Sequence, residues 1–165
     1  MDDSSSLLVE YLRRSYHAVD GLWFMKAEEA VGFDAALQLD QRVWEVLAKI
    51  QARKARELLG VKGNSLAEFA RCFSLGLRAD GYTFEQETAE QEVRFTITGC
   101  PWLELLYRSG RQELAAPIAE VLCPTEARVW CQEFGREVEA DLPAMACLGA
   151  GQCQVVFHQS RAVLK

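Results

Sequence analysis

Val93-Arg94-Phe95-Thr96-Ile97-Thr98 is the stretch that decides the fold, because apolar and polar side chains alternate along it. Alternation with a period of two is typical of a β-strand with one buried and one exposed face. Tyr82 and Phe84 show the same alternation just before it, and the acidic residues 87–90 separate the two segments. The pattern therefore predicts an antiparallel β-hairpin in the middle of the chain.

The residues before this hairpin carry a helical pattern. Apolar side chains recur at spacings of three and four through the first sixty residues, which predicts two long helices. Gly32 marks the break between them, and Gly60 is placed to end the second helix. Ser65, with Glu68 three residues later, is typical of a capping box that begins a third helix, which should end near Asp80.

The residues after the hairpin predict shorter helices. Pro101 suits the first turn of a helix, where its missing N–H costs nothing. The helical pattern is broken at residues 109–110 and then resumes. Pro124 is expected to begin a separate helix that runs to Phe134, because proline is tolerated best in a first turn.

The end of the chain predicts a second antiparallel hairpin. Residues 138–145 and 153–158 read as strands on either side of a glycine-containing loop at residues 149–151. Cysteines flank this loop. The expected fold class is therefore α+β, with long N-terminal helices packed on an antiparallel sheet and a Cys-flanked C-terminal hairpin.

The length fits one domain, because 165 residues bury one sizeable hydrophobic core. We expect a single domain over residues 1–165, helical over 1–80 and mixed, with most of the cysteines, over 81–165. Half of the residues are hydrophobic and a quarter are charged, which is typical of a folded globular chain.

Charge and hydropathy limit the classes of partner that we expect the protein to bind. The 18 Lys and Arg against 24 Asp and Glu give a net charge of −6, so the cationic field that nucleic-acid binding needs is missing. The acidic, polar start Met1-Asp2-Asp3 is unlike a signal peptide, and no long apolar run follows. We therefore expect a cytoplasmic protein that binds neither nucleic acid nor membrane.

In a reducing cytoplasm the six cysteines should not form structural disulfides. Cys72 and Cys131 fall within predicted helices, as small buried side chains do. The other four fall at predicted element ends, where loops let metal ligands converge, and are Cys100, Cys123, Cys147 and Cys153. Their spacing lacks a C-x2-C knuckle, so spacing leaves a metal site and buried thiols both open.

Two sets of blocks resemble a known family. The first runs from Ala18-Val-Asp-Gly-Leu-Trp-Phe-Met-Lys-Ala-Glu-Glu29 through residues 32–37 and 43–53. The second set consists of Cys100-Pro-Trp102, Ser109-Gly-Arg111, Cys123-Pro-Thr-Glu126, Trp130, Glu133-Phe-Gly135 and Cys147-x5-Cys153 with Phe157. Together they resemble an uncharacterised bacterial and archaeal cytosolic family related to L-2-amino-thiazoline-4-carboxylate hydrolase, over nearly the whole chain.

This resemblance implies a pocket for a small organic molecule and, if the chain is an enzyme, hydrolysis of a C–N or C–S bond in a small heterocyclic carboxylate. Glu126 is then the candidate general base for water. Arg111 is the candidate anchor for a substrate carboxylate, because its guanidinium matches that group. Trp102, in the Cys-Pro-Trp block, is a further substrate-binding candidate.

The C-terminal half is more remotely similar to the 4-vinyl-reductase-like domain, a small-molecule-binding fold. In sensors of that kind, cysteines hold zinc together with a Glu three residues before the penultimate Cys, a position that is Ala144 here. The similarity implies zinc or an iron–sulfur cluster on Cys100, Cys123, Cys147 and Cys153, with Asp141 or Glu126 as other possible ligands. It also implies a homodimer and a non-catalytic sensor as the alternative to an enzyme.

Several of these residues have simpler readings. Glu126 suits the first turn of a helix beginning at Pro124, where its charge favours the helix N-terminus. Arg111 suits a solvent-facing helix end. His17 is read as a side chain on one face of a helix. The aromatic group Trp23, Phe24, Phe33 and Trp44 is read as core, or else as the wall of a ligand pocket.

Overall fold

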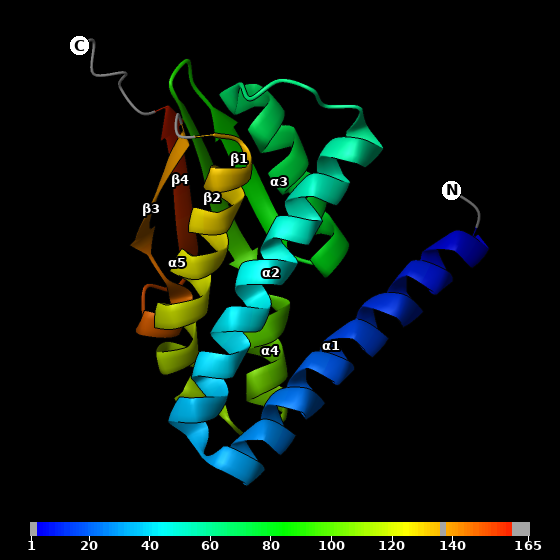
Figure 1. Ribbon diagram of the computed structural model, residues 1–165, viewed down its shortest axis with the longest axis vertical. Helices are drawn as coiled ribbons and strands as arrows, with labels where there is room; N and C mark the ends of the chain where they lie inside the picture. The colour runs from blue at the N-terminus through cyan, green and yellow to red at the C-terminus, as the bar shows by residue number, and fades with distance from the viewer. Residues whose placement is uncertain (1–2, 136–137, 160–165) are drawn as a thin grey trace.

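Four strands form one antiparallel sheet in the computed structural model, which describes residues 3–135 and 138–159 (Figure 1). In chain order they are β1 Thr83–Thr88, β2 Glu92–Gly99, β3 Val138–Ala144 and β4 Cys153–Gln159. Their order in the sheet is β1-β2-β4-β3. Both predicted hairpins are present, and the expected α+β fold is confirmed.

The alternation that predicted β2 sets its register. Val93, Phe95 and Ile97 are buried, while the residues between them are half-buried or exposed. In the pairing with β4, Val93 lies opposite Phe157 and Phe95 opposite Val155. The deciding stretch is therefore a central strand, because it pairs with β1 on one side and β4 on the other.

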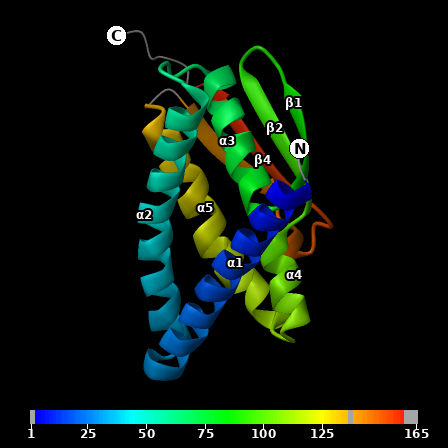
Figure 2. The same ribbon diagram turned by 90° about the vertical axis from the view of Figure 1, so that its right-hand side faces the viewer.

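The helices cover one face of this sheet (Figures 1 and 2). The α-helices are α1 Asp3–Val31, α2 Phe33–Leu59, α3 Leu66–Asp80, α4 Pro101–Arg108 and α5 Ala115–Glu133, with short 3₁₀ turns η1 Gln112–Leu114 and η2 Ala146–Leu148. Helices α3 and α5 lie against the sheet, and α1 crosses in front of them in Figure 2. Among the described residues, no helix combines the length and apolar character needed to cross a bilayer.

The core between helices and sheet is largely aromatic. Phe69 and Phe73 of α3 contact Phe157 of β4, with ring centroids 4.5 and 4.8 Å apart. Trp130 of α5 meets Phe73 edge to face at 5.2 Å. Such pairs add about 0.5–1.5 kcal/mol each beyond the burial of their area, so this cluster fixes α3, α5 and the sheet to one another.

The predicted capping signals are confirmed. Ser65 Oγ accepts the Glu68 N–H at 3.3 Å, and the Glu68 carboxylate accepts the Ser65 N–H at 3.2 Å. This is the reciprocal capping box that stabilises the start of a helix. Gly60 and Gly81 end α2 and α3 with φ of 64° and 91°, a left-handed conformation that glycine adopts without strain.

The predicted helix start at Pro124 is wrong. Helix α5 runs without interruption from Ala115 to Glu133, and Pro124 lies inside it on an exposed position. Proline removes one backbone hydrogen bond there. The neighbouring side chains of Thr125, Ala127 and Trp130 are nevertheless buried in the protein. Packing against the core outweighs the lost bond. Cys123, expected at a helix boundary, is therefore a mid-helix residue.

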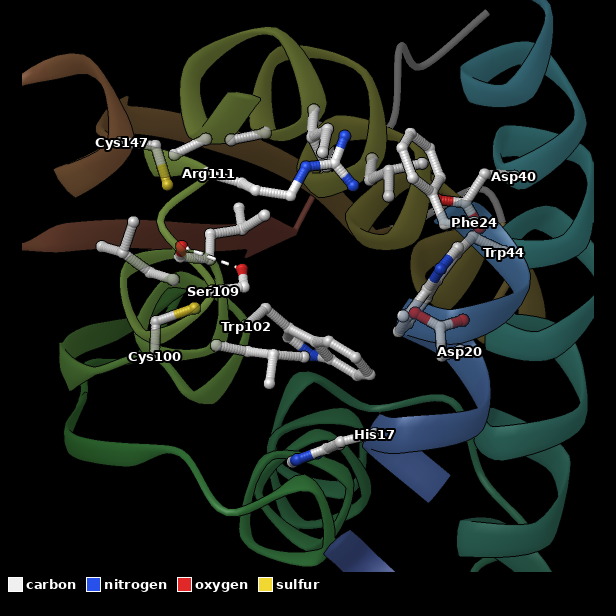
Figure 3. A pocket seen from close by; sticks show the side chains of 18 of the residues that line it. His17, Asp20, Phe24, Asp40, Trp44, Cys100, Trp102, Ser109, Arg111 and Cys147 are labelled. Carbon is white, nitrogen blue, oxygen red and sulfur yellow. Dashed lines mark hydrogen bonds between the residues drawn. The ribbon is translucent and has the colours of Figure 1, made fainter. Parts of the chain in front are cut away.

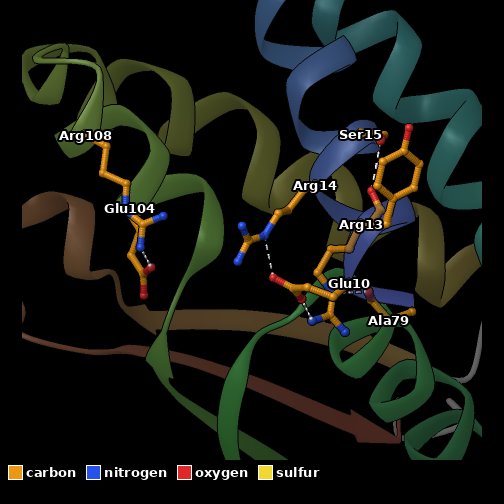
Figure 4. Close-up of polar contacts among 8 residues, drawn as sticks. Glu10, Arg13, Arg14, Ser15, Ala79, Glu104 and Arg108 are labelled. Carbon is orange, nitrogen blue, oxygen red and sulfur yellow. Dashed lines mark hydrogen bonds and ion pairs between the residues drawn. The ribbon is translucent and has the colours of Figure 1, made fainter. Parts of the chain in front are cut away.

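Helix α1 is tied to the end of α3 through Arg13 (Figure 4). Its guanidinium donates to the carbonyl oxygens of Ala79 at 2.8 Å and Arg78 at 3.0 Å. The Arg78 carbonyl also accepts the N–H of the capping Gly81 at 3.2 Å, and a cation at the C-terminal end of a helix is favoured by the helix dipole. Glu10 holds Arg13 in turn at 3.2 Å. The tie places the next turn of α1 beside Asp80.

Candidate functional site

A cavity of about 300 Å³ lies among α1, α2, α4 and α5. Six of the seven site residues predicted from the sequence line it: Cys100, Trp102, Arg111, Cys123, Glu126 and Cys147. The seventh, Cys153, is the first residue of β4 and lies within electrostatic range of the other three thiols. The structure thus brings together residues from α4, from the start of η1, from α5 and from η2, which are far apart in sequence.

Two ends of the cavity differ in chemistry (Figure 3). Asp20 of α1 and Asp40 and Trp44 of α2 lie on one side of the view, and Cys100 and Cys147 on the opposite side. Trp102 lies between them. The cavity therefore has an acidic and aromatic end and a thiol end.

Asp40 is the most buried of the acidic residues, with 3% of its surface exposed. Burial, followed by the nearby Asp20 carboxylate, raises its pKa from 3.8 to about 7. Its Oδ1 atom has no hydrogen-bond partner among the described residues. Such a buried, unpartnered oxygen costs free energy unless something outside the chain donates to it. Burial also raises the pKa of Asp20, to about 6.

Trp102 is held by three aromatic neighbours. Its ring centroid lies 4.4 Å from that of His17, 5.5 Å from Trp44 and 5.8 Å from Tyr16. The Trp44 and Trp102 rings are nearly perpendicular, at 87°. Both indole N–H groups are buried without an acceptor in the described part of the chain. The predicted substrate-binding role of Trp102 is compatible with this position in the cavity wall.

His17 has a fixed orientation. Its ring forms a hydrogen bond to the backbone of Asp80, and its Nε2 atom has no partner among the described residues. Burial lowers its pKa, so the ring is neutral near pH 7. With the other nitrogen donating to a carbonyl, Nε2 is the acceptor of the neutral ring. The sequence placed His17 on one side of a helix but did not predict that it lines a cavity.

Glu126 lies in the cavity wall on α5, three residues after Cys123 and so on the same helix face. Burial, and then the charge of Asp80, raise its pKa from 4.5 to about 8. The reading of Glu126 as a first-turn residue is wrong, because the helix begins at Ala115. Its carboxyl is a buried acid that can give up or take a proton near neutral pH.

The four predicted ligand thiols lie within electrostatic range of one another. Burial raises the pKa of Cys100 to about 11, and the thiols of Cys147 and Cys153 add to it. Burial raises the pKa of Cys123 well above its ordinary value, with contributions from Glu126 and then from the other three thiols. Burial and Cys153 raise the pKa of Cys147. Cys100, Cys123 and Cys147 are therefore poor thiolates without a cation to stabilise them.

Backbone N–H groups face two of these sulfur atoms. The Ala146 N–H donates to Cys153 Sγ at 3.2 Å. Cys100 precedes the first turn of α4, and the N–H groups of Leu103 and Trp102 act to lower its pKa against the effect of burial. N–H donors of this kind stabilise sulfur that carries negative charge.

The donor set fits a thiophilic metal in its chemistry. Four sulfurs with N–H donors suit zinc or an iron–sulfur cluster better than magnesium or calcium, which prefer oxygen. As the side chains are placed in residues 3–135 and 138–159, no three His, Cys, Asp or Glu groups are close enough to hold an ion. Binding would therefore draw the sulfurs closer together.

The structure also places three further residues that the sequence singled out, Arg111, Cys72 and Cys131. Arg111 lines the cavity, but its guanidinium is paired with the Glu28 carboxylate of α1. It is therefore neither a solvent-facing helix end nor a free anchor for a ligand carboxylate. Cys72 and Cys131 are 0% and 7% exposed and lie in the core, which confirms their reading as buried side chains.

Asp40, Asp20 and His17 are the cavity residues that sequence reasoning missed. One signal was available for Asp40, because it interrupts the apolar stripe of α2 between Leu37 and Trp44 at helical spacing. A charged residue on a buried stripe is seldom accidental. No comparable signal marks Asp20 or His17, whose helix α1 carries apolar residues on several faces.

Comparison with known proteins gives a family without an activity. The match is to a family of unknown function (DUF6125) and spans residues 2–104, well over half of the 165 residues. No curated protein and no solved structure matches the chain. The matched residues include α1, α2 and the Cys-Pro-Trp segment, and so much of the cavity wall.

Proposed function

The chain belongs to the DUF6125 family of unknown function, and we propose that it is a cytoplasmic protein that binds a small organic molecule beside a four-cysteine centre. The centre holds zinc or an iron–sulfur cluster on Cys100, Cys123, Cys147 and Cys153. The remote similarity to the 4-vinyl-reductase-like sensors supports a binding role.

One observation carries this proposal. Cys100, Cys123 and Cys147 come from three separate elements and line the same cavity of about 300 Å³. The volume is at the lower end of the range of about 300–1,000 Å³ typical of small-molecule sites. A metal held there would border the same cavity as the bound molecule.

Four thiolates would fill the coordination of zinc and leave no position for water. The metal then supplies structure, because it ties the end of β2, the middle of α5 and the C-terminal hairpin together. Metal binding would contribute several kcal/mol to the folding free energy, as about 10 kcal/mol or more is available at structural zinc sites.

Cys123→Ser should therefore lower the melting temperature sharply, and reconstitution with zinc, or with iron and sulfide, should not restore it. The same reconstitution of metal-free wild type should raise the melting temperature. Cys131→Ser is the matched control, because it removes a buried thiol outside the centre and should keep the gain. If neither zinc nor iron with sulfide changed the melting temperature of the metal-free wild-type protein, that result would contradict the metal centre.

A second candidate function is hydrolysis of a small heterocyclic carboxylate, with Glu126 as the general base. Its support is the resemblance to the thiazoline-carboxylate hydrolases, and a carboxyl with a pKa of about 8 inside the cavity. Glu126→Gln should keep the fold and remove about 10²–10⁴-fold of the hydrolytic rate. An unchanged turnover of L-2-amino-thiazoline-4-carboxylate, or none in the wild type, would remove this candidate.

We also propose a homodimer, as the similarity to the sensors implies. Exposed apolar side chains along α1 support it, including Leu8, Tyr11, Leu12 and Val19, each more than half exposed. A second copy packed on this face would bury them. Sedimentation at the mass of one 18.5 kDa chain would contradict the dimer.

A further inference from the structure

At pH 8 the acidic and aromatic end of the cavity carries a net negative charge, because the pKa values of Asp20 and Asp40 are about 6 and about 7. Asp20, Asp40 and Glu126 line the cavity, and Arg111 is the only Lys or Arg among its described lining residues. Since Glu28 pairs with Arg111, this cation does not neutralise the Asp20 and Asp40 carboxylates. His17, the other basic residue, is neutral near pH 7 because it is buried. An anionic ligand would therefore meet repulsion at this end.

The unpartnered atoms here include acceptors that need a donor. Asp40 is more than nine-tenths buried, and its Oδ1 has no partner among the described residues. His17 Nε2, the acceptor of a neutral ring, is also buried and has no hydrogen-bond partner among the described residues. A ligand N–H would satisfy either atom, whereas a ligand carboxylate could satisfy only the unpartnered indole N–H groups of Trp44 and Trp102 and would leave both acceptors without a donor.

The aromatic faces suit a positive charge. Trp44 and Trp102 stand nearly perpendicular, with centroids 5.5 Å apart, and so form a corner beside Asp40 (Figure 3). Phe24 lines the same end. Indole and phenyl faces attract cations, and the attraction grows where water is excluded. A carboxylate beside an aromatic corner therefore provides both parts of a site for an ammonium group.

We propose that the cavity selects a small organic cation, with an ammonium head held by Asp40 beside the rings of Trp44 and Trp102. The apolar body of the ligand lies along the side chains of α4 and α5 that complete the wall, among them Leu105, Leu106, Ile118 and Leu122. This inference rests on the proposed small-molecule site and names its ligand class.

Three probes of similar shape test the charge. They are 2-phenylethylamine, which is a cation at pH 8, propylbenzene, which is its neutral counterpart, and 3-phenylpropanoate, which is an anion. Binding is followed by the fluorescence of the tryptophans, two of which line the cavity. The amine should bind with a Kd at least about tenfold lower than either other probe, as expected for one desolvated charged hydrogen bond.

The variants assign this preference to named groups. Asp40→Asn keeps the shape and removes the charge, so it should weaken the amine about tenfold and leave propylbenzene unchanged. Trp44→Phe keeps a ring with a weaker face for cations and should weaken the amine several-fold. Asp34→Asn, the same change on an exposed position of α2, is the control and should have no effect. Melting curves of each variant establish that it folds.

The outcomes separate the two claims. Equal binding of amine and propylbenzene, tighter binding of the anion, or an Asp40→Asn protein that keeps its amine affinity would overturn the cation site and leave a small-molecule cavity. Failure of all three probes to bind the folded wild type would overturn both.

Discussion

At the scale of single residues, three carboxyl groups in the cavity wall cost the fold free energy when they are charged. Asp40, Asp20 and Glu126 have pKa values of about 7, 6 and 8 because burial disfavours their charged forms. Proteins retain such groups where they bind or react, since an apolar residue would be more stable in the same place. The free-energy cost of burying these carboxyl groups therefore indicates that they have a function in the cavity.

This cost predicts how stability depends on pH. An unfolded Asp loses its proton near pH 3.8, whereas Asp40 in the folded chain holds its proton to about pH 7. Between these values the folded state binds more protons than the unfolded state, so the free energy of unfolding falls as pH rises. The carboxyl adds no penalty below the unfolded value and its full penalty above the folded one.

Asp40→Asn should remove this contribution. Urea unfolding measured from pH 4 to pH 8 should show that the free energy of unfolding of the variant rises relative to that of the wild type as pH rises. The difference should reach roughly 1–3 kcal/mol at pH 8. Asp34→Asn, on the exposed face of the same helix, should instead follow the wild-type curve. Parallel curves for Asp40→Asn and wild type would mean that Asp40 ionises normally in the fold.

At the scale of elements, α5 carries both halves of the proposed site, because Cys123 and Glu126 lie on its cavity face. It does so despite Pro124, which costs a helix interior about 3 kcal/mol in the absence of compensation. The helix continues because its buried side packs against α2 and the sheet, where Thr125 accepts a hydrogen bond from Gln41 at 3.1 Å.

Pro124→Ala should therefore stabilise the protein, because it restores the N–H that the helix lacks. We expect a gain of about 1–3 kcal/mol in the free energy of unfolding. Pro117→Ala is the matched control, since Pro117 lies in the first turn of α5, where no helical N–H bond is lost. A Pro124→Ala protein no more stable than wild type would show that the helix is already interrupted at this point.

The same comparison shows what local sequence can and cannot predict. The alternation in residues 93–98, the Ser65 capping box and the glycines at 60 and 81 act over one or two turns, so they predict their elements directly. Pro124 was misread because its penalty is local while the packing that offsets it is not. The meeting of Asp40, Trp102 and His17 depends on how three helices pack, which no local pattern encodes.

At the scale of the whole molecule, the chain folds helices over one face of a sheet (Figure 2). A cavity lies among α1, α2, α4 and α5. Cys100, Cys123 and Cys147 line one side of this cavity. The long helices present carboxyl groups and indoles to the other. Ligand and metal would thus bind on opposite walls of one space.

The central claim is that the four thiols form a centre for a metal. Elemental analysis of anaerobically purified wild-type protein, with its visible spectrum, tests it most directly. We predict close to one zinc per chain in a colourless protein, or iron and sulfide in a brown one. A fully folded, colourless protein with neither zinc nor iron would contradict the claim.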